Sequence, residues 1–306
     1  MSDSSAELFA GRKTFFIAPD LSLLPEAYME EYLNHGYETY IIVDDRYCSL
    51  KRKVELIISL FTDSILFFYI DAEIHGIEWP KYIYQLQRTY GDKVLIGVLY
   101  SKRKSDEEKS RLERFYLFDV GIPCGCIPLE YQHAKNFPLI DRILYVNQAG
   151  GRRKTVRAIC DDKSEITFDF KKNQYKGKIC DISLNHFSCI FKDSENVIPV
   201  SSKISDFMLI VNGLHIHADG TLLMQRNTPE GVLNIFVFTR KDGTNGLDSD
   251  SEHRLSQKIY QIVTTRTKNL LQTVFTTAGK EEEEAIEAAK FQAKYGPNNQ
   301  ASQSES

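Results

Sequence analysis

A short cluster of cations lies near the middle of the chain. Arg152, Arg153, Lys154 and Arg157 fall within six residues, no acid lies among them, and two glycines (150–151) come directly before. Glycine lets the backbone bend sharply or approach a ligand closely. Guanidinium groups present planar forks of donors that suit phosphate and the acceptor edge of guanine, and they also stack on bases. The cluster therefore predicts an anion site, and arginine is more informative here than positive charge alone.

A carboxylate and a hydroxyl follow the cations within a segment that has strand spacing. Apolar and polar residues alternate over 166–170, turn-forming residues occupy 173–177, and an apolar pattern resumes before Asp181. Asp181 and Ser183 are two residues apart, so in an extended chain their side chains share one face. A carboxylate there could accept hydrogen bonds from the amino and imino groups of guanine, assisted by the hydroxyl. The segment predicts a hairpin that ends in a polar elbow.

These residues resemble the PilZ family of bacterial cyclic di-GMP receptors over roughly residues 150–275. Two motifs carry the resemblance, Arg-x-x-x-Arg with an arginine before it and Asp-x-Ser downstream: Arg152, Arg153, Arg157, Asp181 and Ser183. The family pattern continues with a glycine, and this chain has His186 at that position. The alternative is that these residues form no ligand site: the cations are a solvent-exposed charged segment, and the Asp-x-Ser motif is an ordinary turn.

The resemblance implies a receptor that binds cyclic di-GMP as a ligand, without a cofactor, and needs no catalysis. It assigns the phosphates and guanine to the arginines, and the guanine edge to Asp181 and Ser183, with His186 beside them. It also implies a signal to an unidentified protein partner, affecting motility or envelope behaviour. Because His186 replaces the glycine, a ligand-independent adaptor of the PilZ type is the alternative function.

The N-terminal half has the pattern of an α/β sandwich. Continuous apolar runs at 13–18, 40–43, 65–70, 94–100 and 124–128 alternate with helical patterns at 24–34, 50–61, 80–90, 106–117 and 132–146. Fully apolar strands separated by helices favour a parallel sheet covered on both faces. We expect a doubly wound parallel sheet like that of flavodoxin or of a receiver domain, and the resemblance makes it a degenerate receiver of the type that precedes PilZ domains.

Ligands bind such sheets at the carboxyl ends of the strands, where this chain has few side chains that could bind or react with a ligand. The turn after the first strand contains no glycine, so it does not predict a phosphate-binding loop. Asp71 ends the third strand as a phosphoacceptor would, but Ile127 to Leu129 occupy the place where a receiver has its lysine. No nucleophile with a base, and no metal cluster, can be assembled from the sequence. We therefore expect no enzyme and no metal site, and interpret Asp71 as a loop carboxylate.

The C-terminal half is expected to form a six-stranded antiparallel barrel with a C-terminal helix. Short strand patterns occur at 197–200, 207–211, 214–218, 221–226 and 232–239, with hairpin turns predicted at Asn212-Gly213 and Asp219-Gly220. Apolar residues at helical spacing then predict a helix over 251–275 that packs against the barrel. The expected domains are 11–147 (receiver-like), 148–278 (barrel) and 279–306 (an acidic, partly disordered tail).

Composition sets limits on partners and location. The 306 residues have a net charge of −4, so any affinity for anions must be local, and we expect no nucleic acid polymer as a partner. No apolar run is long enough to cross a membrane, and the N-terminus lacks the features of a signal peptide. We expect a cytoplasmic protein without membrane insertion.

Overall fold

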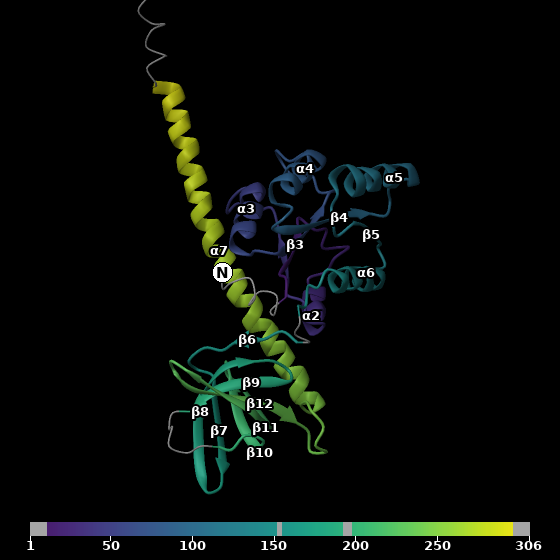
Figure 1. The fold of residues 1–306 in the computed structure, drawn as a ribbon. Coiled ribbons are helices and arrows are strands. Elements are labelled where there is room, and N and C mark those ends of the chain that lie inside the picture. Colours follow the sequence, from purple (N-terminus) through teal and green to yellow (C-terminus); the bar gives the residue numbers. More distant parts are fainter. Residues whose placement is uncertain (1–10, 152–154, 192–197, 296–306) are drawn as a thin grey trace, which may run out of the picture. The chain divides into compact units, whose positions relative to one another are not determined.

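The computed structural model describes residues 11–151, 155–191 and 198–295. Its N-terminal half forms a five-stranded parallel sheet (Figure 1), with the strand order β2-β1-β3-β4-β5. The strands are β1 (Thr14–Ile17), β2 (Thr39–Ile42), β3 (Ser64–Tyr69), β4 (Val94–Ser101) and β5 (Cys126–Leu129). Every residue of β1 and β3 is buried, as expected for inner strands that are covered on both faces.

Helices follow these strands, and two pairs of them are in direct contact. They are α2 (Ala27–Asn34), α3 (Leu50–Leu60), α4 (Trp79–Tyr90), α5 (Asp106–Arg114), a π-helical turn η1 (Phe115–Val120) and α6 (His133–Val146). Phe137 of α6 stacks on Tyr32 of α2 with the ring centroids 4.5 Å apart, while Lys51 of α3 lies over the ring of Tyr82 in α4. This grouping and the strand order confirm the expected doubly wound sheet.

The following strands curl into an antiparallel barrel (Figure 1). They are β6 (Ala158–Ile159), β7 (Glu165–Phe170), β8 (Asn173–Ile182), β9 (His186–Phe191), β10 (Lys203–Val211), β11 (Leu214–Thr228) and β12 (Gly231–Thr239). In the described part of the chain, six of them close a ring in the order β8-β7-β10-β11-β12-β9, and the two-residue β6 adds to β8. Phenylalanines fill the interior, and the rings of Phe187 and Phe236 stack 5.1 Å apart. The expected barrel is confirmed.

The turn predicted at Asp219-Gly220 is wrong. Both residues lie inside β11, where Gly220 pairs with Ile204 of β10 and with Phe238 of β12. A Cβ atom at Gly220 would lie 2.8 Å from the ring of Phe207 and 2.8 Å from the carbonyl oxygen of Val237. Glycine is therefore required here for close packing inside the barrel wall, and the Asp-Gly pair does not mark a turn.

The strand predicted at 197–200 is also not formed in its described part. Residues 198–200 have no strand structure, although Ile198 is buried in the core, and Val197 lies outside the described residues. Pro199 lacks the N–H group that a ladder needs, which explains why this apolar run packs without pairing.

A single long helix, α7 (Ser249–Tyr295), follows the barrel. Leu255, Ile259 and Val263, spaced four residues apart, are buried and pack in the hydrophobic core of the barrel. The predicted packing of this helix on its own barrel is therefore confirmed. The helix continues past Gly279, and residues 296–306 lie outside the described part. None of the helices in the described part is both long and apolar enough to span a bilayer.

Contacts divide the chain into two compact units whose limits do not follow the two sheets. One contains the chain up to residue 14, 21–40 and 130–266, and the other contains 15–20, 41–129 and the chain from 267 onward. The domain limits expected from the sequence, 11–147, 148–278 and 279–306, stay a prediction.

Candidate functional site

Arg157 lies immediately before β6, and this position brings it to Asp181. The two residues of β6 pair with β8, Ala158 opposite Ile182 and Ile159 opposite Asp181. The guanidinium Nη1 of Arg157 donates to Oδ1 of Asp181 over 3.2 Å. Both side chains keep part of their surface in contact with solvent, 32% for Arg157 and 27% for Asp181. The pair that the sequence predicted from two separate motifs is therefore assembled at one edge of the barrel and is accessible.

A buried serine donates a hydrogen bond to the second carboxylate oxygen of Asp181. Oγ of Ser188 donates to Oδ2 of Asp181 over 2.6 Å, and Ser188 is only 1% exposed. The two residues lie opposite each other because the ladder between β8 and β9 shifts register between Ile179 and Asp181. Without this bulge, Asp181 would face Phe187. The sequence reasoning missed Ser188, and the available signal was a single hydroxyl within the apolar run of β9.

Ser183 and His186 form the turn that joins β8 to β9. The backbone N–H of Ser183 donates to the carbonyl of His186 over 2.8 Å, and its hydroxyl donates to the same oxygen over 3.0 Å. The hydroxyl also accepts the backbone N–H of His186 over 3.1 Å. Ser183 is 1% exposed. In this structure its hydroxyl holds the turn, and its predicted contact with guanine stays a prediction.

The positive charge of Arg157 affects the pKa of His186. Burial and the nearby guanidinium both lower the pKa of His186 below its usual value. A lowered pKa favours the neutral imidazole at pH 7, which places no second cation beside Arg157. The residue that replaces the glycine of the family pattern is therefore part of the same cluster.

The structure thus brings together Arg157, Asp181, Ser183 and His186 at the start of β9. Arg152 and Arg153 lie outside the described residues. We call the four described residues and Ser188 the barrel-edge cluster. It offers donors from Arg157, acceptor positions on Asp181, and a polar surface that reaches solvent, which suits binding to an anionic base-bearing ligand.

The thiol beside this cluster is not activated. Burial raises the pKa of Cys160 to about 12, with Asp181 among the smaller causes. The thiol therefore stays protonated at neutral pH and is not a nucleophile. Within the described ranges, no group of three His, Cys, Asp or Glu side chains is placed to hold a metal ion.

Asp71, the phosphoacceptor alternative, is held by two neighbours in the loop after β3. Its Oδ2 accepts the backbone N–H of Ser101 over 2.7 Å, and its Oδ1 lies 2.6 Å from Nζ of Lys104. These bonds tie the loop after β3 to the end of β4. The arrangement agrees with the interpretation of Asp71 as a loop carboxylate.

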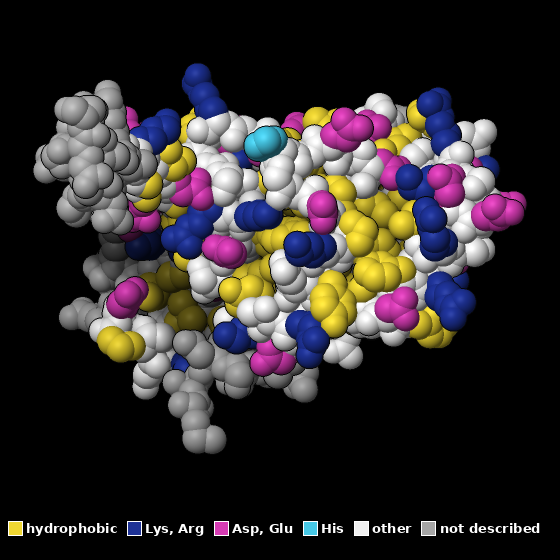
Figure 2. Space-filling view, turned by 90° about the horizontal axis from the view of Figure 1, so that it is seen from above, with side chains coloured by type: hydrophobic (Ala, Val, Ile, Leu, Met, Phe, Trp, Pro, Cys, Tyr) yellow, Lys and Arg dark blue, Asp and Glu magenta, His cyan; other side chains and the backbone are white. Residues whose placement is uncertain are grey.

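Charged side chains of both signs are mixed on the surface. Figure 2 shows lysines and arginines interspersed with aspartates and glutamates, with hydrophobic side chains between them. The described residues on that face form no continuous basic surface, in keeping with the net charge of −4. Any affinity of this face for anions must therefore come from local clusters.

A scan against models of protein families found no match, and no curated protein matches the chain. Among solved structures, the chain is similar to YcgR of Escherichia coli in complex with c-di-GMP, at 12% identity and a TM-score of 0.34, over 39% of this chain and 49% of that one. It is similar to the PilZ domain of YcgR with c-di-GMP, at 10% identity and a TM-score of 0.31, over 39% of this chain and 97% of that one. It is also similar to PlzA of Borreliella burgdorferi in complex with c-di-GMP, at 19% identity and a TM-score of 0.24, over 42% and 48%. The chain spans about half the length of the first YcgR structure and of PlzA.

Proposed function

We propose that this chain is a receptor that binds cyclic di-GMP at the barrel-edge cluster and acts without catalysis. The observation that carries the proposal is the meeting of Arg157, Asp181 and Ser188 at one accessible edge of the barrel. These residues come from three separate segments of the chain, the residue before β6, strand β8 and strand β9.

The chemistry of the cluster suits a doubly charged guanine nucleotide. A guanidinium has five N–H donors, so Arg157 retains donors for a phosphate or for the acceptor edge of guanine after it binds Asp181. Each oxygen of a carboxylate accepts more than one hydrogen bond, so Asp181 retains acceptor positions for the amino and imino groups of guanine. Arg153 is four residues from Arg157, a span of at most about 14 Å. Chain length therefore allows Arg152 and Arg153 to reach the same ligand.

The proposal is tested by calorimetric titration of the full chain with cyclic di-GMP. We expect saturable binding for the wild type and a loss of affinity of tenfold or more for Arg157→Ala and for Arg153→Ala, because a hydrogen bond to a charged group contributes about 1.5 to 3 kcal/mol. The matched control is Arg226→Ala, an exposed arginine of β11. Wild-type heat that survives Arg157→Ala unchanged would contradict the proposed site.

The finer physiological assignment follows from the family resemblance. We expect the chain to act in the cytoplasm, to signal to a protein partner through the parallel-sheet half, and to affect motility or envelope behaviour. A pull-down from a cytoplasmic extract with and without cyclic di-GMP tests this assignment. Enrichment of the same proteins under both conditions would contradict a ligand-dependent signal.

A ligand-independent adaptor is the second candidate, and one observation favours it. Both oxygens of Asp181 and the hydroxyl of Ser183 already have partners within the chain, so the cluster is satisfied without a ligand. His186→Gly separates the two functions, because it restores the glycine of the family pattern. A silent wild type combined with a binding His186→Gly variant would favour the adaptor.

A further inference from the structure

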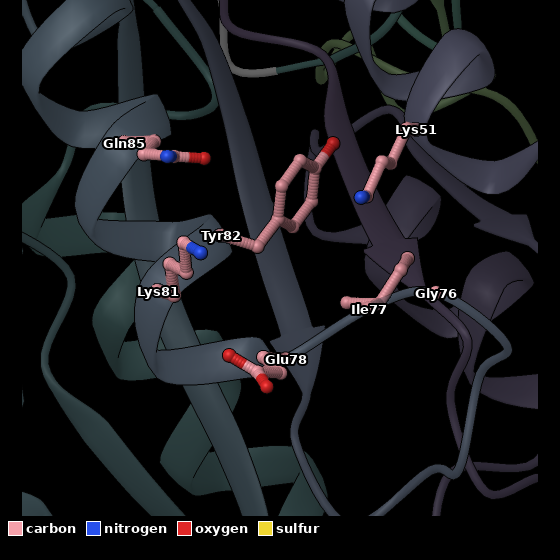
Figure 3. A pocket seen from close by; sticks show the side chains of 7 residues that line it. All are labelled: Lys51, Gly76, Ile77, Glu78, Lys81, Tyr82 and Gln85. Atoms are coloured by element: carbon pink, nitrogen blue, oxygen red, sulfur yellow. The ribbon is translucent and has the colours of Figure 1, made fainter.

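A pocket of about 340 Å³ lies in the parallel-sheet half. Figure 3 shows the seven residues that line it, Lys51, Gly76, Ile77, Glu78, Lys81, Tyr82 and Gln85. Its size falls at the small end of the range for binding sites of small molecules. It shares no residue with the barrel-edge cluster.

The pocket occupies a favoured position in this type of sheet. Lys51 lies in the first turn of α3, which follows β2, and the loop 76–78 follows β3 and leads into α4. Both segments are at the carboxyl ends of their strands. The direction of the connections reverses between the neighbouring strands β1 and β3, so the loop after β3 borders this switch point. Open α/β sheets bind ligands outside the carboxyl ends of the strands near such a reversal.

Two lysines that form no ion pair with the described residues supply the positive charge of the pocket. In Figure 3 the ammonium groups of Lys51 and Lys81 point toward the ring of Tyr82 between them. Nζ of Lys51 lies 5.8 Å from the centre of that ring. Within the ranges that the structure describes, neither lysine has an ion-pair or hydrogen-bond partner. The two ammonium groups are therefore available to an anion.

The hydroxyl of Tyr82 is buried without a partner. Tyr82 is 9% exposed, and its hydroxyl has no hydrogen-bond partner among the described residues. Figure 3 shows this hydroxyl directed toward the helix that carries Lys51. Burial is the main cause that raises the pKa of Tyr82, so the hydroxyl stays protonated and can donate. A buried polar group without a partner destabilises the folded protein, and a ligand atom that accepts a hydrogen bond from this hydroxyl would remove that cost.

We propose that this pocket binds a small anion that carries hydroxyl groups, such as a sugar phosphate or a sugar acid. Lys51, Lys81 and the hydroxyl of Tyr82 would hold the phosphate or carboxylate. The carboxylate of Glu78 and the amide oxygen of Gln85, which lie on either side of Lys81 along the start of α4 (Figure 3), would accept hydrogen bonds from the hydroxyl groups. The negative charge of Glu78 disfavours ligands that have no such donors, so the pocket selects for hydroxylated anions.

The test is calorimetric titration of the full chain with ribose 5-phosphate and with gluconate, using uncharged ribose as the control ligand. We expect saturable binding of at least one anion below about 10 mM, and none of ribose. The double variant Lys51→Gln, Lys81→Gln should weaken binding at least tenfold. The same substitution at Lys93, an exposed lysine before β4, is the matched control and should leave the affinity unchanged.

Tyr82→Phe provides an independent variant that keeps the ring. We expect it to weaken anion binding several-fold without lowering the melting temperature, because the hydroxyl that it removes has no partner in the chain. Failure of both anions to bind, equal binding of ribose, or full binding by the double lysine variant would overturn the proposal. Titration of the same samples with cyclic di-GMP tests the barrel site separately, so the two proposals can fail independently.

Discussion

The barrel and the parallel sheet each contain an aspartate bound to a cation, but the two carboxylates are placed differently. Asp181 is bound by the arginine Arg157 and by a serine hydroxyl at an edge of the barrel. Asp71 is bound by Lys104 and by the backbone N–H of Ser101, between two loops of the sheet. Asp181 has 27% of its side chain exposed, compared with 18% for Asp71.

The type of cation determines whether the ion pair can also bind a ligand. An arginine that donates one hydrogen bond to a carboxylate retains other donors in a rigid planar fork, whereas a lysine is a compact point charge. The Arg157 pair can therefore take a ligand while it remains formed. The Lys104 pair uses its charge to connect two loops, and we expect Asp71 to contribute to stability alone.

Among the substitutions that compare the two aspartates, the largest effect is expected for Asp181→Asn. The substitution keeps the size of the side chain but removes the charge that binds Arg157, and it replaces one of the carboxylate oxygens that would accept from guanine with an amide N–H donor. We expect cyclic di-GMP affinity to fall by about tenfold, corresponding to about 1.4 kcal/mol. Calorimetry measures it, with the exposed Asp169→Asn of β7 as the matched control. Equal or tighter binding by Asp181→Asn would show that Asp181 does not contact the ligand.

Ser188→Ala tests the hydroxyl that orients Asp181. Loss of a buried hydrogen bond to a carboxylate should lower the free energy of unfolding by about 1.5 kcal/mol and weaken cyclic di-GMP binding several-fold. Ser164→Ala is the matched control, since this buried serine of the barrel donates to another aspartate, Asp161. Denaturant unfolding and titration should show a stability loss in both variants, but an affinity loss only in Ser188→Ala.

Asp71→Asn tests the role of the Asp71–Lys104 ion pair in the parallel-sheet half. An amide oxygen can still accept from Ser101, but the ion pair with Lys104 is lost, so we expect the free energy of unfolding to fall by about 1 kcal/mol. Affinity for cyclic di-GMP should remain within about twofold of the wild type. Incubation with a small phosphodonor and magnesium should leave the wild type unlabelled. Labelling that disappears in Asp71→Asn would instead assign the sheet to phosphotransfer.

The smallest effect concerns the titration of His186. Burial is the larger cause of its lowered pKa, and the guanidinium of Arg157 is the second. Arg157→Ala should therefore raise the pKa of His186 toward 6.5, as measured by NMR titration of the imidazole. An unchanged pKa would mean that the two side chains are not neighbours in solution.

The same lowered pKa predicts a pH dependence of stability. Because the pKa is lower in the folded chain, the unfolded chain binds more protons as the pH falls below about 6.5, and stability decreases through that range. His186→Gln removes this contribution and should flatten the dependence of the unfolding free energy on pH between 6.5 and the lowered pKa. A steeper decrease in the variant would contradict the assigned direction.

Much of the fold could be predicted from the sequence because its signals are local. Continuous apolar runs and helical spacing located the strands and helices of the parallel sheet. The misplaced turn at Gly220 has a non-local cause. An Asp-Gly pair favours a turn by itself, but here Phe207 and Val237 on neighbouring strands require a residue without a side chain.

The candidate site was predictable in its types of residue but not in its connections. Arg157 and Asp181 were expected to meet, and they do. The role of Ser188 depends on the bulge near Cys180, which places it opposite Asp181, and no local pattern specifies that register. The hydroxyl of Ser183 was expected to face a ligand, whereas the tight turn to His186 uses it within the chain.

The most direct measurement is an NMR titration of the isotope-labelled full chain with cyclic di-GMP. The account predicts saturable chemical-shift changes centred on the backbone amides of Arg157, Asp181, His186 and Ser188, with no comparable change at Asp71 or Ser101. Changes centred on the loop of Asp71, or no saturable change anywhere, would contradict it.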